Sequence, residues 1–295
     1  METNSPAPPN REVAITFDDI PGSATLFDRC DASAVRAFNT RMLRTIRRER
    51  IAVTGFVVGG SLCGALRDAL LPSLLRDWRE AGHRLGNHGF SHWDYNRVGS
   101  NAYLADILHA ERVMGDALPD RDSGQRYFRA PLLHTGDTAE KRSRLMDFLR
   151  ERGYRNGLVT IDNQEWVFAT AYARAKRERD AARMRRVVDA YLAHLDAAFA
   201  YFETEARVTF GREPPQILLL HANELNADHF DRVMAMIRQR GYRVVDLDHA
   251  LADPVYAEDD AYIGPRGLSW TLRHALKQGR TPGEEPREPA WLRTP

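Results

Sequence analysis

The chain has 295 residues, of which 43% are hydrophobic and 28% are charged, a balance typical of one large globular domain or two small ones. Lysine and arginine number 42 against 41 acidic residues, and the resulting net charge of +1 gives no reason to expect a nucleic-acid partner. No apolar run is long enough to predict a membrane span. The polar start METNSPAPPN is unlike an export signal, so we expect a cytoplasmic protein, or a secreted or periplasmic one if a signal was removed.

The predicted elements alternate between short strands and helices. Apolar, β-branched runs predict strands at residues 13–17, 51–58, 126–128, 158–161, 217–220 and 243–247. Apolar residues at three- and four-residue steps predict helices near residues 35–46, 66–78, 103–114 and 230–237. This alternation indicates a parallel sheet covered by helices, and both a single α/β barrel and an open sheet fit it.

Three segments depart from this rhythm. Residues 1–10 predict a flexible tail, and residues 11–253 form the predicted main domain. Within it, residues 167–208 predict a long helix or helix pair that is inserted and packed on the domain. Residues 254–295 are rich in proline, glycine and charge, which predicts a partly loose C-terminal extension.

The two cysteines, Cys30 and Cys63, are too few for a disulfide framework or a cysteine metal site. We interpret both as small packing residues.

The first strand, in REVAITFDDIPG, ends in two adjacent acids, Asp18 and Asp19. Neighbouring carboxylates repel each other and resist dehydration, so a fold keeps them beside a positive charge or for chemistry. The alternative is a simple turn or helix cap after the strand.

Other polar side chains also follow predicted strands or short segments: His88 and His92, Arg129, Asp162 and His221. Each has a structural alternative, such as a buried hydrogen-bonded histidine or, for Asp162, a helix cap. In α/β folds, however, functional groups collect at the carboxyl ends of parallel strands, so the joint arrangement predicts an active site.

The chemistry of these groups suggests their roles. Asp19, His88 and His92 supply one carboxylate and two imidazoles, a ligand set for Zn²⁺ or a similar divalent ion. Asp18 is then free to act as general base, with Arg129 offsetting the repulsion within the acid pair. His221 is the candidate general acid, with Asp162 holding its other ring nitrogen.

These residues resemble the five motifs of the polysaccharide deacetylase family, carbohydrate esterase family four. The motifs are TFDD at 16–19, HGFSH at 88–92, RAP at 129–131, DNQEW at 162–166 and LLLH at 218–221, and they occur in the family's order over roughly residues 12–252. The resemblance implies a distorted (β/α) barrel of about seven strands, here with a long helical insertion. It also implies metal-dependent removal of acetyl from N-acetylated sugars.

The resemblance supports the roles given above and adds three residues. It implies that Trp166 and Leu219 wall a pocket for the acetyl methyl group, and that the N–H of Leu132 helps to bind the oxyanion. This chain departs from the family at Gly89, where Ser or Thr is usual, so a supporting hydrogen bond is expected to be lost. It departs again at residues 132–134, which replace an aromatic and glycine, and at Glu165, where Asp is usual.

We therefore expect a deacetylase that uses one divalent metal, Zn²⁺ first and Co²⁺ or another ion as alternatives. Its expected substrate is an N-acetylated sugar from peptidoglycan, chitin or an oligosaccharide. A hydrolase of another C–N bond, in a cyclic imide, ureide or small amide, is the second hypothesis, and a carbohydrate-binding protein with an inactive site is the third. The oligomeric state is left open.

Overall fold

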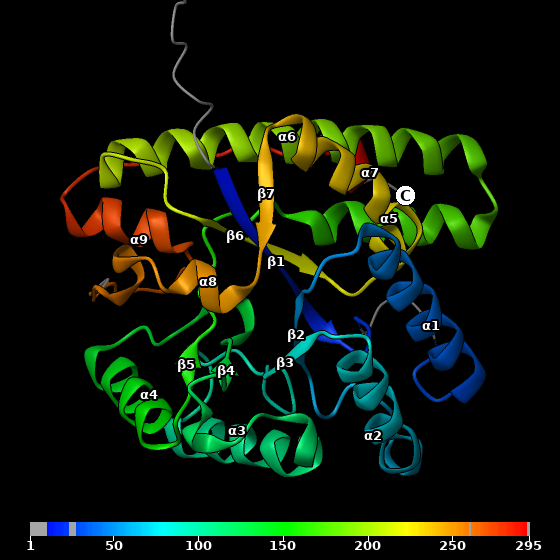
Figure 1. Ribbon diagram of the computed structural model, residues 1–295, viewed down its shortest axis with the longest axis horizontal. Helices are drawn as coiled ribbons and strands as arrows, with labels where there is room; N and C mark the ends of the chain where they lie inside the picture. Colours follow the sequence, from blue (N-terminus) through cyan, green and yellow to red (C-terminus); the bar gives the residue numbers. More distant parts are fainter. Residues whose placement is uncertain (1–10, 24–27, 260, 294–295) are drawn as a thin grey trace, which may run out of the picture.

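The computed structural model describes residues 11–23, 28–259 and 261–293, and in this part of the chain seven strands form one parallel sheet (Figure 1). The predicted tail at residues 1–10 lies outside the described residues. The spatial order is β5-β4-β3-β2-β1-β6, and β7 also pairs with β1. The strands are β1 (Arg11–Ile20), β2 (Thr54–Val57), β3 (Arg84–Asn87), β4 (Tyr127–Phe128), β5 (Arg155–Asn156), β6 (Gln216–His221) and β7 (Tyr242–Val245).

The sheet curls into a distorted (β/α) barrel, as predicted, because the chain after β5 returns to β6. Ile161 forms an isolated parallel bridge to Leu218, and its N–H and C=O bond to the backbone of β6 on either side. The predicted strand at 158–161 is therefore reduced to this bridge, while the regular pairing of β5 lies at residues 155–156.

Sequence periodicity missed β3, whose residues are Arg, Leu, Gly and Asn. The glycine has a packing reason: a Cβ at Gly86 would lie 2.8 Å from the ring of Phe56 on β2. The strand β3 is thus buried between β2 and β4 although its sequence contains no apolar run that would predict a strand.

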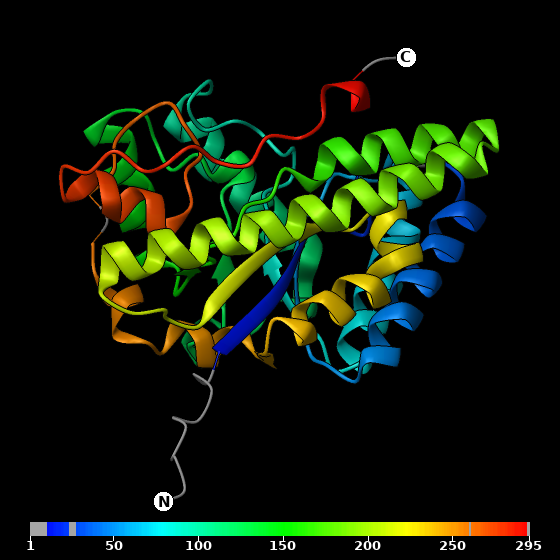
Figure 2. The same cartoon turned by 90° about the horizontal axis from the view of Figure 1, so that it is seen from above.

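Nine α-helices are present among the described residues, and most of them cover the outside of the sheet (Figure 1). They are α1 (Ala32–Glu49), α2 (Gly64–Glu80), α3 (Ser100–Met114), α4 (Ala139–Glu151), α5 (Glu165–Glu178), α6 (Ala181–Phe210), α7 (Glu224–Gln239), α8 (Leu247–Leu251) and α9 (Trp270–Lys277). The segment predicted as a helix or helix pair is the pair α5 and α6, which pack on each other and on α7 (Figure 2).

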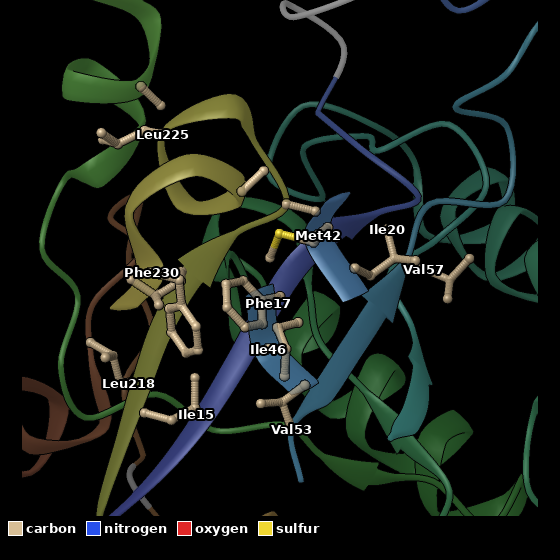
Figure 3. Close-up of a cluster of buried hydrophobic side chains, with 14 of the residues drawn as sticks. Ile15, Phe17, Ile20, Met42, Ile46, Val53, Val57, Leu218, Leu225 and Phe230 are labelled. Carbon is tan, nitrogen blue, oxygen red and sulfur yellow. The ribbon is translucent and has the colours of Figure 1, made fainter. Parts of the chain in front are cut away.

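The alternation of side chains along β1 separates two apolar layers. Ile15 and Phe17 point outward and pack against Met42 and Ile46 of α1 and Phe230 of α7 (Figure 3). Ala14, on the opposite face, packs inside the barrel with Phe56 and Tyr127. Thr16 and Asp18 share that inner face, which directs the first acid of the pair into the barrel mouth.

The C-terminal extension, predicted to be partly loose, contacts the main domain at two places. Trp270 and Leu272 of α9 are buried, and Arg273 beside them is only 4% exposed. Farther on, Gly283 bonds to Tyr201 and Glu205 of α6, so the chain runs along that helix (Figure 2). Buried aromatic and aliphatic side chains of α9 and the contacts of Gly283 anchor the extension at these two places.

The interpretation of the cysteines as packing residues is wrong. Cys30 and Cys63 form a disulfide, with Cα atoms 5.1 Å apart. Cys30 precedes α1 and Cys63 precedes α2, and these two loops are neighbours because β1 and β2 pair in the sheet.

Among the helices of the described residues, none combines the length and the apolar content that a membrane span requires.

Candidate active site

A pocket of about 550 Å³ lies at the carboxyl ends of the strands. It brings together nine of the ten predicted site residues: Asp18, Asp19, His88, His92, Leu132, Asp162, Trp166, Leu219 and His221. Arg129, the tenth, lies fully buried behind Asp18. These residues come from five separate chain segments, so the fold has assembled them from a distance.

The Asp18 carboxylate is held by the guanidinium of Arg129. Arg129 Nη1 donates to Asp18 Oδ1 at 2.6 Å and to Thr16 Oγ1 at 2.8 Å, and its other nitrogens donate to the carbonyls of Gly157 and Leu158. The guanidinium also lies over the ring of Phe56, 4.0 Å from its centroid. Burial opposes the charged form of Asp18, but the nearby charges, that of Arg129 first, lower its pKa. Asp18 is therefore ionised and fixed in direction.

His221 faces Asp18 across the sheet. The parallel pairing of β1 with β6 runs in register from Val13 opposite Gln216 to Asp18 opposite His221, and the N–H of Ala222 bonds to the Asp18 carbonyl. Register between two buried strands thus places the candidate base and the candidate acid at the same level of the pocket.

Asp19, His88 and His92 form a cluster in which one possible ligand atom of each residue lies within 4.8 Å of the others. His92 Nε2 is 3.5 Å and His88 Nε2 is 3.9 Å from Asp19 Oδ1. Asp19 and His92 both have positive φ, +65° and +54°, which is strained backbone for residues with a side chain. One carboxylate and two imidazoles converging in this way fit the donor set of a divalent metal.

The environment of His88 suits a ligand. Its Nδ1 lies 2.8 Å from the carbonyl oxygen of Arg129, which can only accept a hydrogen bond, so Nδ1 carries the proton and Nε2 keeps its lone pair toward the cluster. Burial lowers the pKa of His88 to about 4, and the ring is therefore neutral at neutral pH. Neutral imidazole is the form that binds metal ions.

The loop that carries both histidines is held by Asp106 of α3, a residue that sequence reasoning missed. Its carboxylate accepts the N–H groups of Phe90 and Ser91 at 2.8–3.1 Å. Gly89, with φ of +77°, brings the loop close to it, since a Cβ there would lie 3.0 Å from Asp106 Oδ2. Gly89 has no hydroxyl group to support the loop as Ser or Thr would. Hydrogen bonds from the backbone of the loop to the Asp106 carboxylate hold it instead.

The predicted partner of His221 requires a correction. The Nδ1 atom of His221 lies 2.8 Å from Oε2 of Glu165, a residue in the first turn of α5. No hydrogen bond to Asp162, the predicted partner, is present among the described contacts of His221. Glu165 is 1% exposed, and its Oε1 accepts the side-chain amides of Asn223 and Asn226. Burial disfavours the charged ring, but the hydrogen bond and charge of Glu165 outweigh it and raise the pKa of His221 to about 10.

Asp162 lies in the pocket wall, where it accepts the N–H of Gln164 at 3.4 Å. Burial raises the pKa of this carboxyl group above its ordinary value. The start of α5 explains the exchange of roles: the chain turns at Gln164, which has φ of +53°, and this directs the longer Glu165 side chain under His221.

The remaining predicted residues form apolar walls. Trp166 is 49% and Leu132 is 54% exposed, large values for such side chains, while Leu219 is nearly buried. Leu132 and Leu133 both have positive φ, +58° and +56°. An ordered charged floor with exposed apolar walls is the usual character of a small-molecule site.

This combination defines an α/β barrel with a candidate metal cluster flanked by a fixed carboxylate and a charged histidine, and comparison with known proteins supports the fold. A sequence model of the polysaccharide deacetylase family matches residues 5–150. Residues 5–150 therefore carry a polysaccharide deacetylase domain.

Solved structures of that family share the fold. A family-four pseudoenzyme of Bacillus anthracis, BA3943, is 14% identical with a TM-score of 0.52, and the match covers 83% of this chain and 66% of that one. A mutant of BA3943 with restored enzymatic activity is 16% identical with a TM-score of 0.51, and the match covers 83% of this chain and 69% of that one. The Bc1960 peptidoglycan N-acetylglucosamine deacetylase is 17% identical with a TM-score of 0.51, and the match covers 82% of this chain and 88% of that one. Active and inactive proteins therefore share this architecture, so activity must be argued from the site.

Proposed function

We propose that this protein is a metal-dependent deacetylase that removes acetyl groups from an N-acetylated sugar of peptidoglycan, chitin or a related oligosaccharide. The observation that carries the proposal is the complete set of groups in one pocket: the cluster of Asp19, His88 and His92, with Asp18 and His221 beside it. The match of residues 5–150 to the polysaccharide deacetylase family supports the same reaction.

Asp19, His88 and His92 would hold the metal, and Zn²⁺ matches their two nitrogens and one oxygen best. When bound, such an ion polarises an amide carbonyl and lowers the pKa of water toward neutrality.

The chain's own residues supply the proton transfers. Asp18, kept ionised and aimed by Arg129, takes a proton from the water that attacks the acetyl carbonyl carbon. His221, kept charged by Glu165, donates a proton to the sugar nitrogen as the C–N bond breaks. Acetate and a free amine are the products.

The pocket walls would position the acetyl group. Trp166 and Leu219 offer apolar contacts to its methyl, and the N–H of Leu132 would stabilise charge on the carbonyl oxygen. Because the side chains of Leu132 and Trp166 are exposed, they contribute little to the packing of the core, and this supports a role in binding.

The disulfide bears on the compartment in which the protein would act. Cys30–Cys63 is of the kind that persists in oxidising surroundings and is rare in the cytosol. It favours the secreted or periplasmic alternative over the cytoplasmic one, and a cell-wall polymer would be accessible there.

The test is acetate release from N-acetylglucosamine oligomers by zinc-loaded protein. Asp18→Asn is the control for contaminating esterase and should keep its metal while losing about two to four orders of magnitude in turnover. Release that disappears in this variant supports the deacetylase. If metal-loaded protein releases none, the sugar oligomers are excluded, and cyclic imides and small acetylated amides are assayed next. An equal rate in the Asp18→Asn protein would remove the base from the proposed mechanism.

A further inference from the structure

A second cavity, of about 360 Å³, adjoins the catalytic pocket. Asp162, Gln164 and Gly267 line both spaces, so a ligand that fills the catalytic pocket can continue past these residues into the second cavity. The predicted roles of the sequence motifs leave this space without a function.

The walls of this cavity come largely from the C-terminal extension. Arg266, Gly267 and Glu285 belong to it, and Phe202 of α6 forms part of the opposite side. The matched family region ends at residue 150, so these walls lie outside it. The extension also packs tightly on Leu132, directly after the third motif, because a Cβ at Gly267 would overlap the carbonyl oxygen of Leu132.

The chemistry of the cavity is mainly that of a polar site with hydrogen-bond acceptors. Asp162 and Glu285 both contribute carboxylates, and burial and then the charge of Asp162 raise the pKa of Glu285, so the two groups sense each other. Arg266 is mostly exposed and lies 3.8 Å from Glu285, which leaves the carboxylates incompletely neutralised. Phe202 and Leu272 lie behind the cavity, and at 1% and 3% exposure they offer a ligand almost no surface, so its accessible lining is mainly polar.

We propose that this cavity is a second sugar subsite, so that the substrate is an oligosaccharide with a hydrogen-bond-donating unit next to the acetylated one. A sugar ring matches this polar lining, since its hydroxyl or ammonium groups donate hydrogen bonds to the carboxylates of Asp162 and Glu285. The proposal rests on the deacetylase function proposed above. It assigns the C-terminal extension a part in selecting substrate length.

Glu285→Gln tests the subsite, because it removes the charge and keeps the shape. Glu284→Gln is the matched control, since Glu284 is the neighbouring exposed residue and is not among the cavity walls. Acetate release by zinc-loaded protein is compared for N-acetylglucosamine and its dimer. We expect Glu285→Gln to lower the dimer-to-monomer ratio of kcat/KM about tenfold, the effect of losing one charged hydrogen bond, and Glu284→Gln to leave it unchanged. An unchanged ratio in Glu285→Gln overturns the subsite.

Two dimers distinguish which donor is recognised. One carries acetyl on both units, and the other carries a free ammonium on the unit next to the acetylated one. A larger loss for the second identifies the ammonium, and equal losses identify the hydroxyls. If no sugar releases acetate, the proposed function fails, and the affinities of native protein and Glu285→Gln for monomer and dimer are measured by calorimetry. Weaker dimer binding confined to the variant supports the subsite even then, and equal affinities refute it.

Discussion

The Arg273 side chain of α9 donates a hydrogen bond of 2.6 Å to the carbonyl of Leu133, next to the proposed oxyanion donor Leu132. Its other nitrogens donate to Thr135 Oγ1 at 3.0 Å and to the carbonyl of Leu268 at 2.8 Å. Two consecutive leucines with positive φ are energetically unfavourable and persist only where their surroundings hold them. The C-terminal extension supplies that constraint.

Replacing Arg273 should therefore affect both stability and turnover. We expect Arg273→Met to lower the free energy of unfolding by about 3 kcal/mol, because several buried carbonyl and hydroxyl acceptors lose a charged donor. Turnover should fall further than the folded fraction explains, because the Leu132 N–H is no longer held in place. Denaturant unfolding and acetate release at a temperature where the variant is folded would measure the two effects.

Arg280→Met is the control for Arg273→Met. Arg280 lies in the same extension but pairs with Glu205 of α6, away from the pocket. It should lose some stability and keep the turnover of its folded fraction. Equal turnover per folded molecule in both variants would contradict the positioning role of Arg273.

The polar residues at the ends of the strands could be predicted from the sequence because each depends only on the short run of residues before it. Asp18, Arg129 and His221 each follow a short apolar run, and parallel strands bring such positions to one edge. Pattern reasoning could therefore predict the ligand cluster and its neighbours without knowing the strand order.

Features that depend on distant contacts could not be predicted in this way. Asp162 and Glu165 are two acids three positions apart, and only the conformation at Gln164 decides which one reaches His221. Asp106 stands on the same helix face as the apolar Tyr103, which is a signal of burial, but its partner loop lies outside the helix. The Cys30–Cys63 pair likewise required knowledge that β1 and β2 are neighbours.

The candidate metal cluster predicts a specific loss. His88→Ala should lose bound zinc and activity together, because Nε2 of His88 would supply one of three proposed ligands and the site would keep too few. His249→Ala is the matched control, since His249 pairs with Glu12 far from the pocket. Metal content by elemental analysis after dialysis measures the effect, and full zinc occupancy in His88→Ala would remove this residue from the ligand set.

The disulfide predicts a dependence of stability on redox state. Cys30 and Cys63 are separated by 33 residues, and joining them restricts the unfolded chain. The Cys30→Ser, Cys63→Ser double variant should lose about 3 kcal/mol in unfolding free energy. Reductant should lower the melting temperature of the native protein toward that of the variant and leave the variant unchanged. Identical melting curves for native protein with and without reductant would contradict the pairing.

The His221–Glu165 pair predicts the alkaline limit of activity. The pKa of His221 is raised to about 10, so the ring carries its proton below that pH and loses it above, and the rate should fall there if His221 is the acid. By linkage, the stability that the pair contributes is complete below a pH of about 6.5 and is lost as the pH rises through about 10. Glu165→Gln keeps the hydrogen-bonding shape and removes the charge. The alkaline limb should then move down by about one to two pH units.

Two measurements check this shift in Glu165→Gln. The pH profile of kcat/KM reports the limb, and the NMR titration of the His221 ring in metal-loaded protein reports the proton itself. Glu178→Gln, at the exposed end of the same helix, should leave both unchanged. If the ring titration moves and the limb does not, another group limits the rate at high pH and His221 is not the acid. If neither moves, Glu165 does not set the charge of His221, and the hydrogen bond between them is structural.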